Sequence, residues 1–143
     1  MISDFHFLTM DERIRKARTG LTEQGFVELK TAAEVDRAVE KAGTTLVFVN
    51  SICCCGEDVA RPAMKIALST GKKPNYLVSV FAGQEKEATE KAREYFIGYA
   101  PSSPAIALMK DGKICRMIER HELTTETPEQ IALKLQAMFE AFC

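Results

Sequence analysis

The amino-acid sequence predicts an α/β protein with a mixed four- to five-stranded central sheet, helices on both faces and an extra helix at the N-terminus. The run TTLVFVN at 44–50 is rich in apolar and β-branched residues, which is typical of a central strand buried on both faces. Helical segments alternate with short strands through the first half of the chain, and this order requires right-handed parallel crossovers. Asp111-Gly112 separates short strands at 105–110 and 113–119 and indicates an antiparallel hairpin.

Capping boxes open three of the predicted helices, because a threonine is followed three residues later by glutamate or glutamine. Gly20 is expected to end the first helix. Pro62 either kinks the third helix or occupies its first turn. The boxes pair Thr9 with Glu12, Thr31 with Glu34, and Thr127 with Gln130. The predicted helices span about 9–20, 31–42, 57–71, 85–99 and 127–142, and further short strands lie at 26–29 and 75–82.

The length and composition predict one domain, 1–143, in which residues 1–20 form an N-terminal helical extension. A net charge of −1 and an isoelectric point of about 6.2 offer no basic surface for nucleic acid. No apolar run is long enough to span a membrane. The first residues carry an early acid and no apolar core of signal-peptide length, so we expect a cytoplasmic protein. The sequence does not decide the oligomeric state.

The five cysteines of the chain include three adjacent ones, Cys53, Cys54 and Cys55, directly after the predicted central strand. An odd, clustered set in a chain expected to be cytoplasmic argues against a structural disulfide framework. Redox chemistry and metal binding remain as possible functions of the clustered cysteines. Of the other two, Cys115 is expected to pack within a strand and Cys143 to be exposed at the C-terminus.

The cysteine run lies between a predicted strand end and a predicted helix start. A helix N-terminus stabilises a thiolate and lowers its pKa, whereas the nearby Glu57 and Asp58 oppose a further negative charge. A disulfide between Cys53 and Cys55 is easier to close than one between adjacent cysteines, which leaves Cys54 outside the pair. Two alternatives are that the thiols pack as small apolar groups, or that they bind zinc or an iron–sulfur cluster, a geometry that adjacent ligands fit poorly.

Ser103-Pro104 stands directly before the predicted strand at 105–110, which should lie beside the cysteine strand. One interpretation is a cis-proline loop that packs against the thiols and exposes a backbone edge to a disulfide substrate. The other is a plain loop, because most X–Pro bonds in folded proteins are trans.

Other polar residues near the predicted strand ends also have two interpretations. Asn50 and Ser51 either orient the cysteine loop or serve ordinary turn chemistry. Arg120 and His121 either attract the carboxylates of an acidic thiol or form a solvated, charged strand end.

Several motifs, in order and spacing, resemble the bacilliredoxin family, whose members have the thioredoxin fold. The similarity runs from about Gly20 to Leu123. That family usually carries Cys-Gly-Cys, and Cys54 stands here in place of the glycine, which leaves the outer pair, Cys53 and Cys55, intact. The motifs are TTLVFVNSICCCG, ARPA, KPNYLVSVFAGQEKEATEKAREYF, GYAPSSPAIALMKDGK and MIERHEL.

The resemblance implies a thioredoxin-like thiol–disulfide oxidoreductase that reduces mixed disulfides between protein cysteines and bacillithiol, a low-molecular-weight thiol, with weak disulfide isomerase activity. Cys53 would attack the mixed disulfide, and Cys55 or a second bacillithiol would resolve it. Ser103, Pro104 and Cys54 would line the substrate cleft. The partners would be thiolated or disulfide-bonded proteins. No bound cofactor is implied, since bacillithiol is a co-substrate that glutathione, coenzyme A or another protein could replace.

A different class of function fits the same residues. In this alternative the chain is a non-enzymatic thioredoxin-fold module whose cysteines hold a soft metal ion such as Cu(I) or Zn(II). Stoichiometric metal on protein purified under reducing conditions, bound through Cys53 and Cys55, would favour it.

Overall fold

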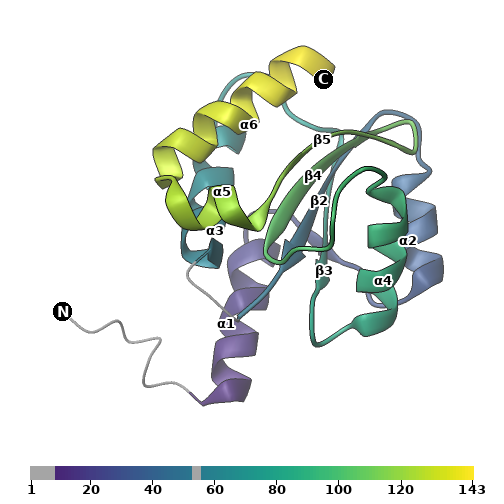
Figure 1. The fold of residues 1–143 in the computed structure, drawn as a ribbon, viewed down its shortest axis with the longest axis vertical. Helices are drawn as coiled ribbons and strands as arrows, with labels where there is room; N and C mark the ends of the chain where they lie inside the picture. Colours follow the sequence, from purple (N-terminus) through teal and green to yellow (C-terminus); the bar gives the residue numbers. More distant parts are fainter. Residues whose placement is uncertain (1–8, 53–55) are drawn as a thin grey trace.

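The computed structural model describes residues 9–52 and 56–143 and has a five-stranded sheet at its centre (Figure 1). The strand order is β1-β3-β2-β4-β5. Neighbours among β1, β3 and β2 are parallel, whereas β4 is antiparallel to β2 and β5 to β4, so the predicted mixed sheet is confirmed. The strands are β1 (Val27–Glu28), β2 (Thr44–Asn50), β3 (Tyr76–Phe81), β4 (Ala105–Lys110) and β5 (Lys113–Ile118). The helices are α1 (Met10–Thr22), α2 (Ala32–Val39), α3 (Gly56–Leu68), α4 (Lys86–Tyr95), α5 (Arg120–Thr125) and α6 (Pro128–Phe142).

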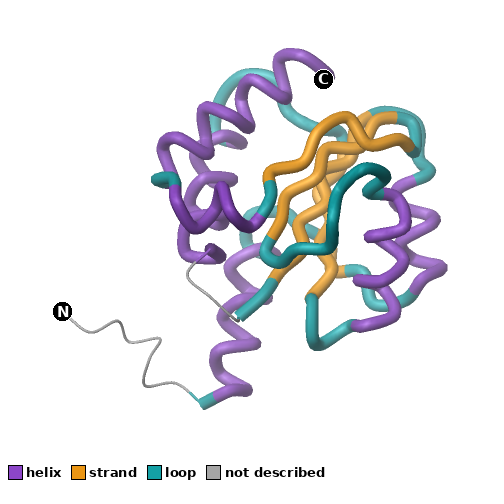
Figure 2. Tube along the Cα trace, viewed as in Figure 1, coloured by secondary structure: helices purple, strands orange, loops and turns teal. Residues whose placement is uncertain are grey.

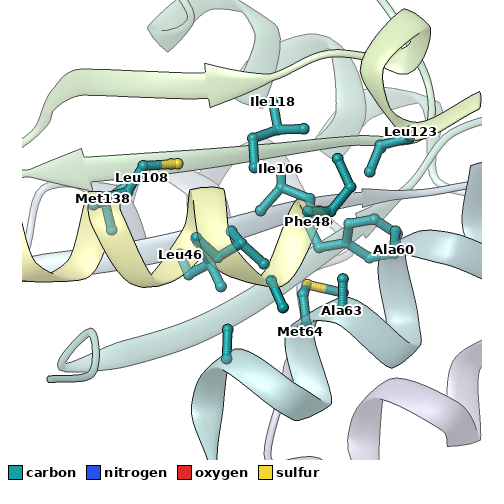
Figure 3. Packing of buried hydrophobic residues seen from close by; sticks show 14 of the residues in the cluster. Leu46, Phe48, Ala60, Ala63, Met64, Ile106, Leu108, Ile118, Leu123 and Met138 are labelled. Atoms are coloured by element: carbon teal, nitrogen blue, oxygen red, sulfur yellow. The ribbon is translucent and has the colours of Figure 1, made fainter. Parts of the chain in front are cut away.

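Helices cover both faces of the sheet, with α3, α5 and α6 on one side and α2 and α4 on the other (Figure 2). Alternate residues of β2 point to opposite faces. Leu46 and Phe48 join the apolar cluster under α3 and α6 (Figure 3), whereas Val47 and Val49 join the cluster under α2 and α4. Every residue of β2 is buried, as predicted for the run at 44–50.

The β4–β5 hairpin closes on Asp111 and Gly112, whose φ angles are +50° and +81°. Positive φ at both central residues defines the type I′ turn, which confirms the prediction from this dipeptide. The Asp111 carboxylate accepts a 2.7 Å hydrogen bond from the Gly43 N–H, and the Gly43 carbonyl accepts one of 2.9 Å from the Asp111 N–H. The hairpin turn is thereby tied to the start of β2.

The predicted capping boxes at Thr31 and Thr127 are both present. Each hydroxyl accepts a hydrogen bond from the backbone N–H three residues later, and the side chain of Glu34 or Gln130 accepts one in return. These reciprocal bonds satisfy N–H groups that a helix start leaves unpaired.

α1 extends beyond its predicted end at Gly20 and finishes at Thr22. Gly20 lies against α3, where an added Cβ would stand 3.4 Å from Cδ of Arg61. Gly20 therefore lies inside α1, beside α3, and does not end the helix. Ala17 and Leu21 are fully buried, so α1 packs against the rest of the described structure.

Pro62 lies inside α3 rather than in its first turn, which decides between the two predicted positions. Two further differences concern the helices. α4 ends at Tyr95, earlier than predicted, before Gly98 at a φ of +92°. α5 was not predicted, because glutamates rather than serine or threonine mark its start: the Glu119 N–H donates to the Glu122 carboxylate at 2.9 Å.

Among the described residues, no helix is long and apolar enough to cross a membrane.

Candidate functional site

The candidate site lies at the carboxyl end of β2, where the chain continues toward α3. β2 is the middle strand of the sheet and ends at Asn50, and α3 begins at Gly56. Asn50 and Ser51 are buried and Ile52 is half-buried. The cysteine run at 53–55 follows Ile52 in the sequence and lies outside the described residues. Its pairing and the roles of its thiols therefore stay predictions.

Ser103 and Pro104 lie at the same edge of the sheet as Asn50. Val49 pairs with Ala105 in the antiparallel β2–β4 ladder, so the residue after Val49 and the residue before Ala105 are at the same end of that ladder. The Ser103–Pro104 peptide bond is cis, which confirms this part of the prediction. Pro104 is buried and Ser103 is half-buried. Their predicted contact with the thiols involves 53–55 and stays a prediction.

The side chain of Asn50, only 2% exposed, connects three elements at this edge. Its Nδ2 donates to the Ala17 carbonyl of α1 at 3.1 Å. Its Oδ1 accepts from the Ser51 N–H at 3.0 Å and from Nη1 of Arg61, on α3, at 3.4 Å. The backbone carbonyl of Asn50 accepts from the Ala82 N–H at 3.0 Å, directly after β3. Asn50 therefore links α1, α3 and the residue after β3, in addition to the local bond with Ser51 that a turn would explain.

A second contact from α1 reaches the last residue before the cysteine run. Nη2 of the half-buried Arg13 donates to the Ile52 carbonyl at 2.9 Å. That carbonyl belongs to the peptide bond that joins Ile52 to Cys53. The contact joins residues 39 positions apart, and no local sequence pattern marks Arg13 as part of the site.

Arg18 attaches α1 to further elements of the fold. Its guanidinium makes two hydrogen bonds to the Glu85 carboxylate, at 2.5 and 2.9 Å, and one of 3.1 Å to Glu28. It also lies over the ring of Phe81, 4.9 Å from the ring centroid. The hydrogen bonds and charges of the two glutamates raise the pKa of Arg18, against the opposing effect of burial. α1 is therefore attached to β1, to the end of β3 and to the start of α4.

Arg120 and His121 are exposed and begin α5, rather than ending a strand. With the loop at 100–102 they line an open pocket of about 340 Å³. Ligand atoms of His121, Glu119 and Glu122 lie within 4.8 Å of one another, and the Glu122 carboxylate is paired with Lys134 at 2.8 Å. In residues 9–52 and 56–143 these three are the one cluster that could hold a metal ion, and it contains no cysteine.

The remaining cysteines differ in exposure. Cys143 is exposed, as predicted. Cys115 is half-buried, at the point where the β4–β5 register shifts. Burial raises the pKa of the Cys115 thiol, and the Lys110 ammonium offsets part of that rise.

Two thioredoxins are among the solved structures with the same architecture. The reduced thioredoxin pre-protein of Schistosoma mansoni matches with a TM-score of 0.57 at 17% identity, over 82% of this chain and 98% of that one. Oxidised mitochondrial thioredoxin 3 of Saccharomyces cerevisiae matches with a TM-score of 0.54 at 12% identity, over 83% and 97% of the two chains. At such identities the likeness shows the fold, which is the thioredoxin fold.

Sequence comparison gives the family. The sequence profile of a family described as disulphide isomerase matches residues 9–143. A bacilliredoxin of Bacillus cereus is 51% identical over 140 residues, 98% of this chain and 96% of that relative. Bacilliredoxins of Geobacillus kaustophilus and Staphylococcus epidermidis are each 48% identical, over 97% and 98% of this chain and 96% and 97% of theirs.

Fold and relatives together define a thioredoxin-fold protein of a thiol–disulfide oxidoreductase family. Within that class, the chain belongs to the bacilliredoxin family.

Proposed function

We propose that this chain reduces mixed disulfides between protein cysteines and bacillithiol. The observation that carries the proposal is the identity of 48–51% with bacilliredoxins over 97–98% of the chain. The position of the cysteine run in the sequence, between the buried middle strand and the start of α3, supports it. A helix N-terminus favours the thiolate form that such exchange requires.

In the proposed reaction Cys53 is the nucleophile and Cys55 resolves the intermediate. The Cys53 thiolate attacks the bacillithiol sulfur of the mixed disulfide, and the target cysteine leaves as a thiolate. The Cys55 thiolate then attacks the Cys53 sulfur, which releases bacillithiol as a thiolate and forms a Cys53–Cys55 disulfide. Two further bacillithiol molecules reduce that disulfide and leave as bacillithiol disulfide. Alternatively, one bacillithiol resolves the adduct on Cys53 directly.

Ser103, Pro104 and Cys54 are proposed to line the cleft that receives the protein disulfide. The Val49–Ala105 pairing supports this, because it brings the Ser103–Pro104 loop to the end of the sheet where β2 leads into the cysteine run. The proposed partners are thiolated or disulfide-bonded proteins and a low-molecular-weight thiol, with no bound cofactor. We expect a cytoplasmic location, weak disulfide isomerase activity, and neither nucleic acid nor a membrane as partner.

The test uses a target protein carrying bacillithiol on one cysteine, with release followed by mass spectrometry. Cys53→Ser should abolish release. Cys55→Ser should accumulate a bacillithiol adduct on Cys53, because exchange stalls at the mixed disulfide. Cys143→Ser, which changes an exposed thiol at the end of α6, is the matched control and should leave release unchanged.

Two results would contradict the proposal. One is an adduct on Cys54 or Cys55 while Cys53 stays free, which would overturn the assignment of roles. The other is faster removal of glutathione or coenzyme A than of bacillithiol from the same target, which would overturn the assignment of the thiol.

A further inference from the structure

Of the three residues before the cysteine run, Asn50 and Ile52 are hydrogen-bonded to other elements of the fold, and Ser51 is bonded to Asn50. The carbonyl of Asn50 accepts from Ala82, and its side chain bridges α1 and α3. The Ser51 N–H donates to the Asn50 side chain, and the Ile52 carbonyl accepts from Arg13. Since buried backbone groups in folded proteins are nearly always paired, some partners are expected here. Two of the bonds of this segment are made with α1, one by the Asn50 side chain to the Ala17 carbonyl and one by the Ile52 carbonyl with Arg13.

We propose that Arg13 and Asn50 are positioning residues, which hold the Asn50–Ile52 segment against α1 and thereby set the peptide that leads into the nucleophile Cys53. This inference rests on the proposed function for the role of Cys53. The contacts themselves involve only described residues.

α1 is suited to this task because one of its faces is fixed. Arg13, Ala17 and Leu21 are spaced four residues apart and so share that face. Ala17 and Leu21 are fully buried, and the Ala17 carbonyl is the acceptor for Asn50. The two bonds to Glu85 that hold Arg18 restrain the same helix. Arg13 therefore reaches Ile52 from a helix that cannot shift without breaking several buried contacts.

The Asn50 side chain uses both its amide nitrogen and its amide oxygen in hydrogen bonds. Nδ2 must donate, because the Ala17 carbonyl only accepts, and Oδ1 must accept, because Ser51 N–H and Arg61 only donate. Aspartate has the same shape but would set a carboxylate oxygen against the Ala17 carbonyl. Asn50→Asp therefore removes one link of the segment to α1 and keeps the link to α3.

Arg13 also brings a positive charge to the peptide bond that precedes Cys53. A cation close to a thiol favours the thiolate, so removing it should raise the pKa of the thiol. Arg13→Met removes both the hydrogen bond and the charge, and Arg13→Lys keeps the charge. Arg15→Met makes the same chemical change at an exposed position of α1 and is the matched control.

The experiment measures the rate of iodoacetamide alkylation of Cys53 against pH in the full-length chain carrying Cys54→Ser and Cys55→Ser. In Arg13→Met the midpoint should move up by roughly 0.5–1 pH unit, a modest value because Arg13 is only half-buried. Arg13→Lys should restore most of that shift, and Arg15→Met should leave the midpoint in place. With the cysteines intact, Asn50→Asp and Arg13→Met should each slow release of bacillithiol from a target by about tenfold.

Thermal unfolding of the same variants separates positioning from stability. If Arg13→Met lowers the midpoint of thermal unfolding but leaves the alkylation profile identical to that of Arg15→Met, Arg13 is structural only and the inference is wrong. Because alkylation needs no bacillithiol, this readout stands even if the proposed substrate is wrong. Failure of the proposed function would instead appear as absent release by the unaltered chain.

Discussion

Val49 pairs with Ala105 across β2 and β4, and this register brings the cis Ser103–Pro104 bond to the end of the sheet that leads into the cysteine run. Burial on both faces fixes the register. Val49 and Ala105 belong to the apolar cluster under α2 and α4, whereas Phe48 and its partner Ile106 belong to the cluster under α3 and α6. A slip by one residue would exchange the faces of every side chain of one strand. The core thus determines the geometry of the candidate site.

The core beneath α6 should dominate stability. Leu135 is fully buried, whereas Leu133 on the same helix is 67% exposed. Leu135→Ala should lower the free energy of unfolding by about 2–5 kcal/mol, because it removes buried methyl groups and leaves a cavity. Leu133→Ala should change it by less than about 0.5 kcal/mol. Equilibrium urea unfolding measures both, and similar losses would show that α6 does not pack as described.

Gly43 should tolerate alanine less well than Gly71. Both have positive φ, +98° and +78°, so alanine pays a similar backbone cost at each. At Gly43 an added Cβ would stand 2.5 Å from Oδ1 of Asn75, which accepts hydrogen bonds from Thr44 at the start of β2. At Gly71 nothing lies within 4 Å. Gly43→Ala should therefore give the lower midpoint of thermal unfolding; equal midpoints would mean that Asn75 moves aside without cost.

The link between α5 and α6 should weaken in acid. Lys134 lies 2.8 Å from Glu122 and 2.5 Å from Glu126. Burial by itself raises the pKa of Glu122, but the hydrogen bond and charge of Lys134 outweigh it, and the net pKa lies below the ordinary value of 4.5. A carboxyl with a lowered pKa contributes stability above its unfolded-state pKa, and this contribution is lost as pH falls through the folded-state value.

The measurement is the difference in free energy of unfolding between the unaltered chain and Lys134→Met as a function of pH. We expect the difference to be largest near neutral pH and to shrink below about pH 4. Lys86→Met, at an exposed position of α4, is the control. A difference that stays constant into acid would assign the effect of Lys134 to packing rather than charge.

Local patterns were sufficient to predict most of the elements. The run at 44–50 predicts the buried middle strand, Asp111-Gly112 predicts the antiparallel hairpin, and the three threonines predict the starts of α1, α2 and α6. The predictions were wrong where the role of a residue depends on a contact with a residue distant in the sequence. Gly20 resembles a helix stop, but α1 continues through it to Thr22, and Leu21 beyond it is fully buried, a tertiary contact that no local pattern records.

The residues of the candidate site likewise divide into those that local sequence predicts and those that depend on contacts distant in the sequence. Asn50 and the cis bond before Pro104 were singled out because they adjoin strand ends, where local sequence is informative. Arg13 was not, because its contact with Ile52 depends on how α1 docks on the sheet. Docking is set by many buried contacts together, among them Leu21 and the pair of Arg18 with Glu85.

The two cysteines outside the run should react with iodoacetamide at very different rates. Cys143 is exposed, and Cys115 is half-buried with a pKa raised chiefly by burial. At mildly alkaline pH fewer Cys115 thiols are ionised and access to them is restricted, so Cys143 should react about tenfold faster. The Cys143 thiolate also raises the pKa of Cys115, so Cys143→Ser should speed alkylation of Cys115 slightly. Mass mapping over time measures both rates, and unfolding in guanidinium chloride should make them equal. Equal rates in the folded chain would show that β5 does not shield Cys115.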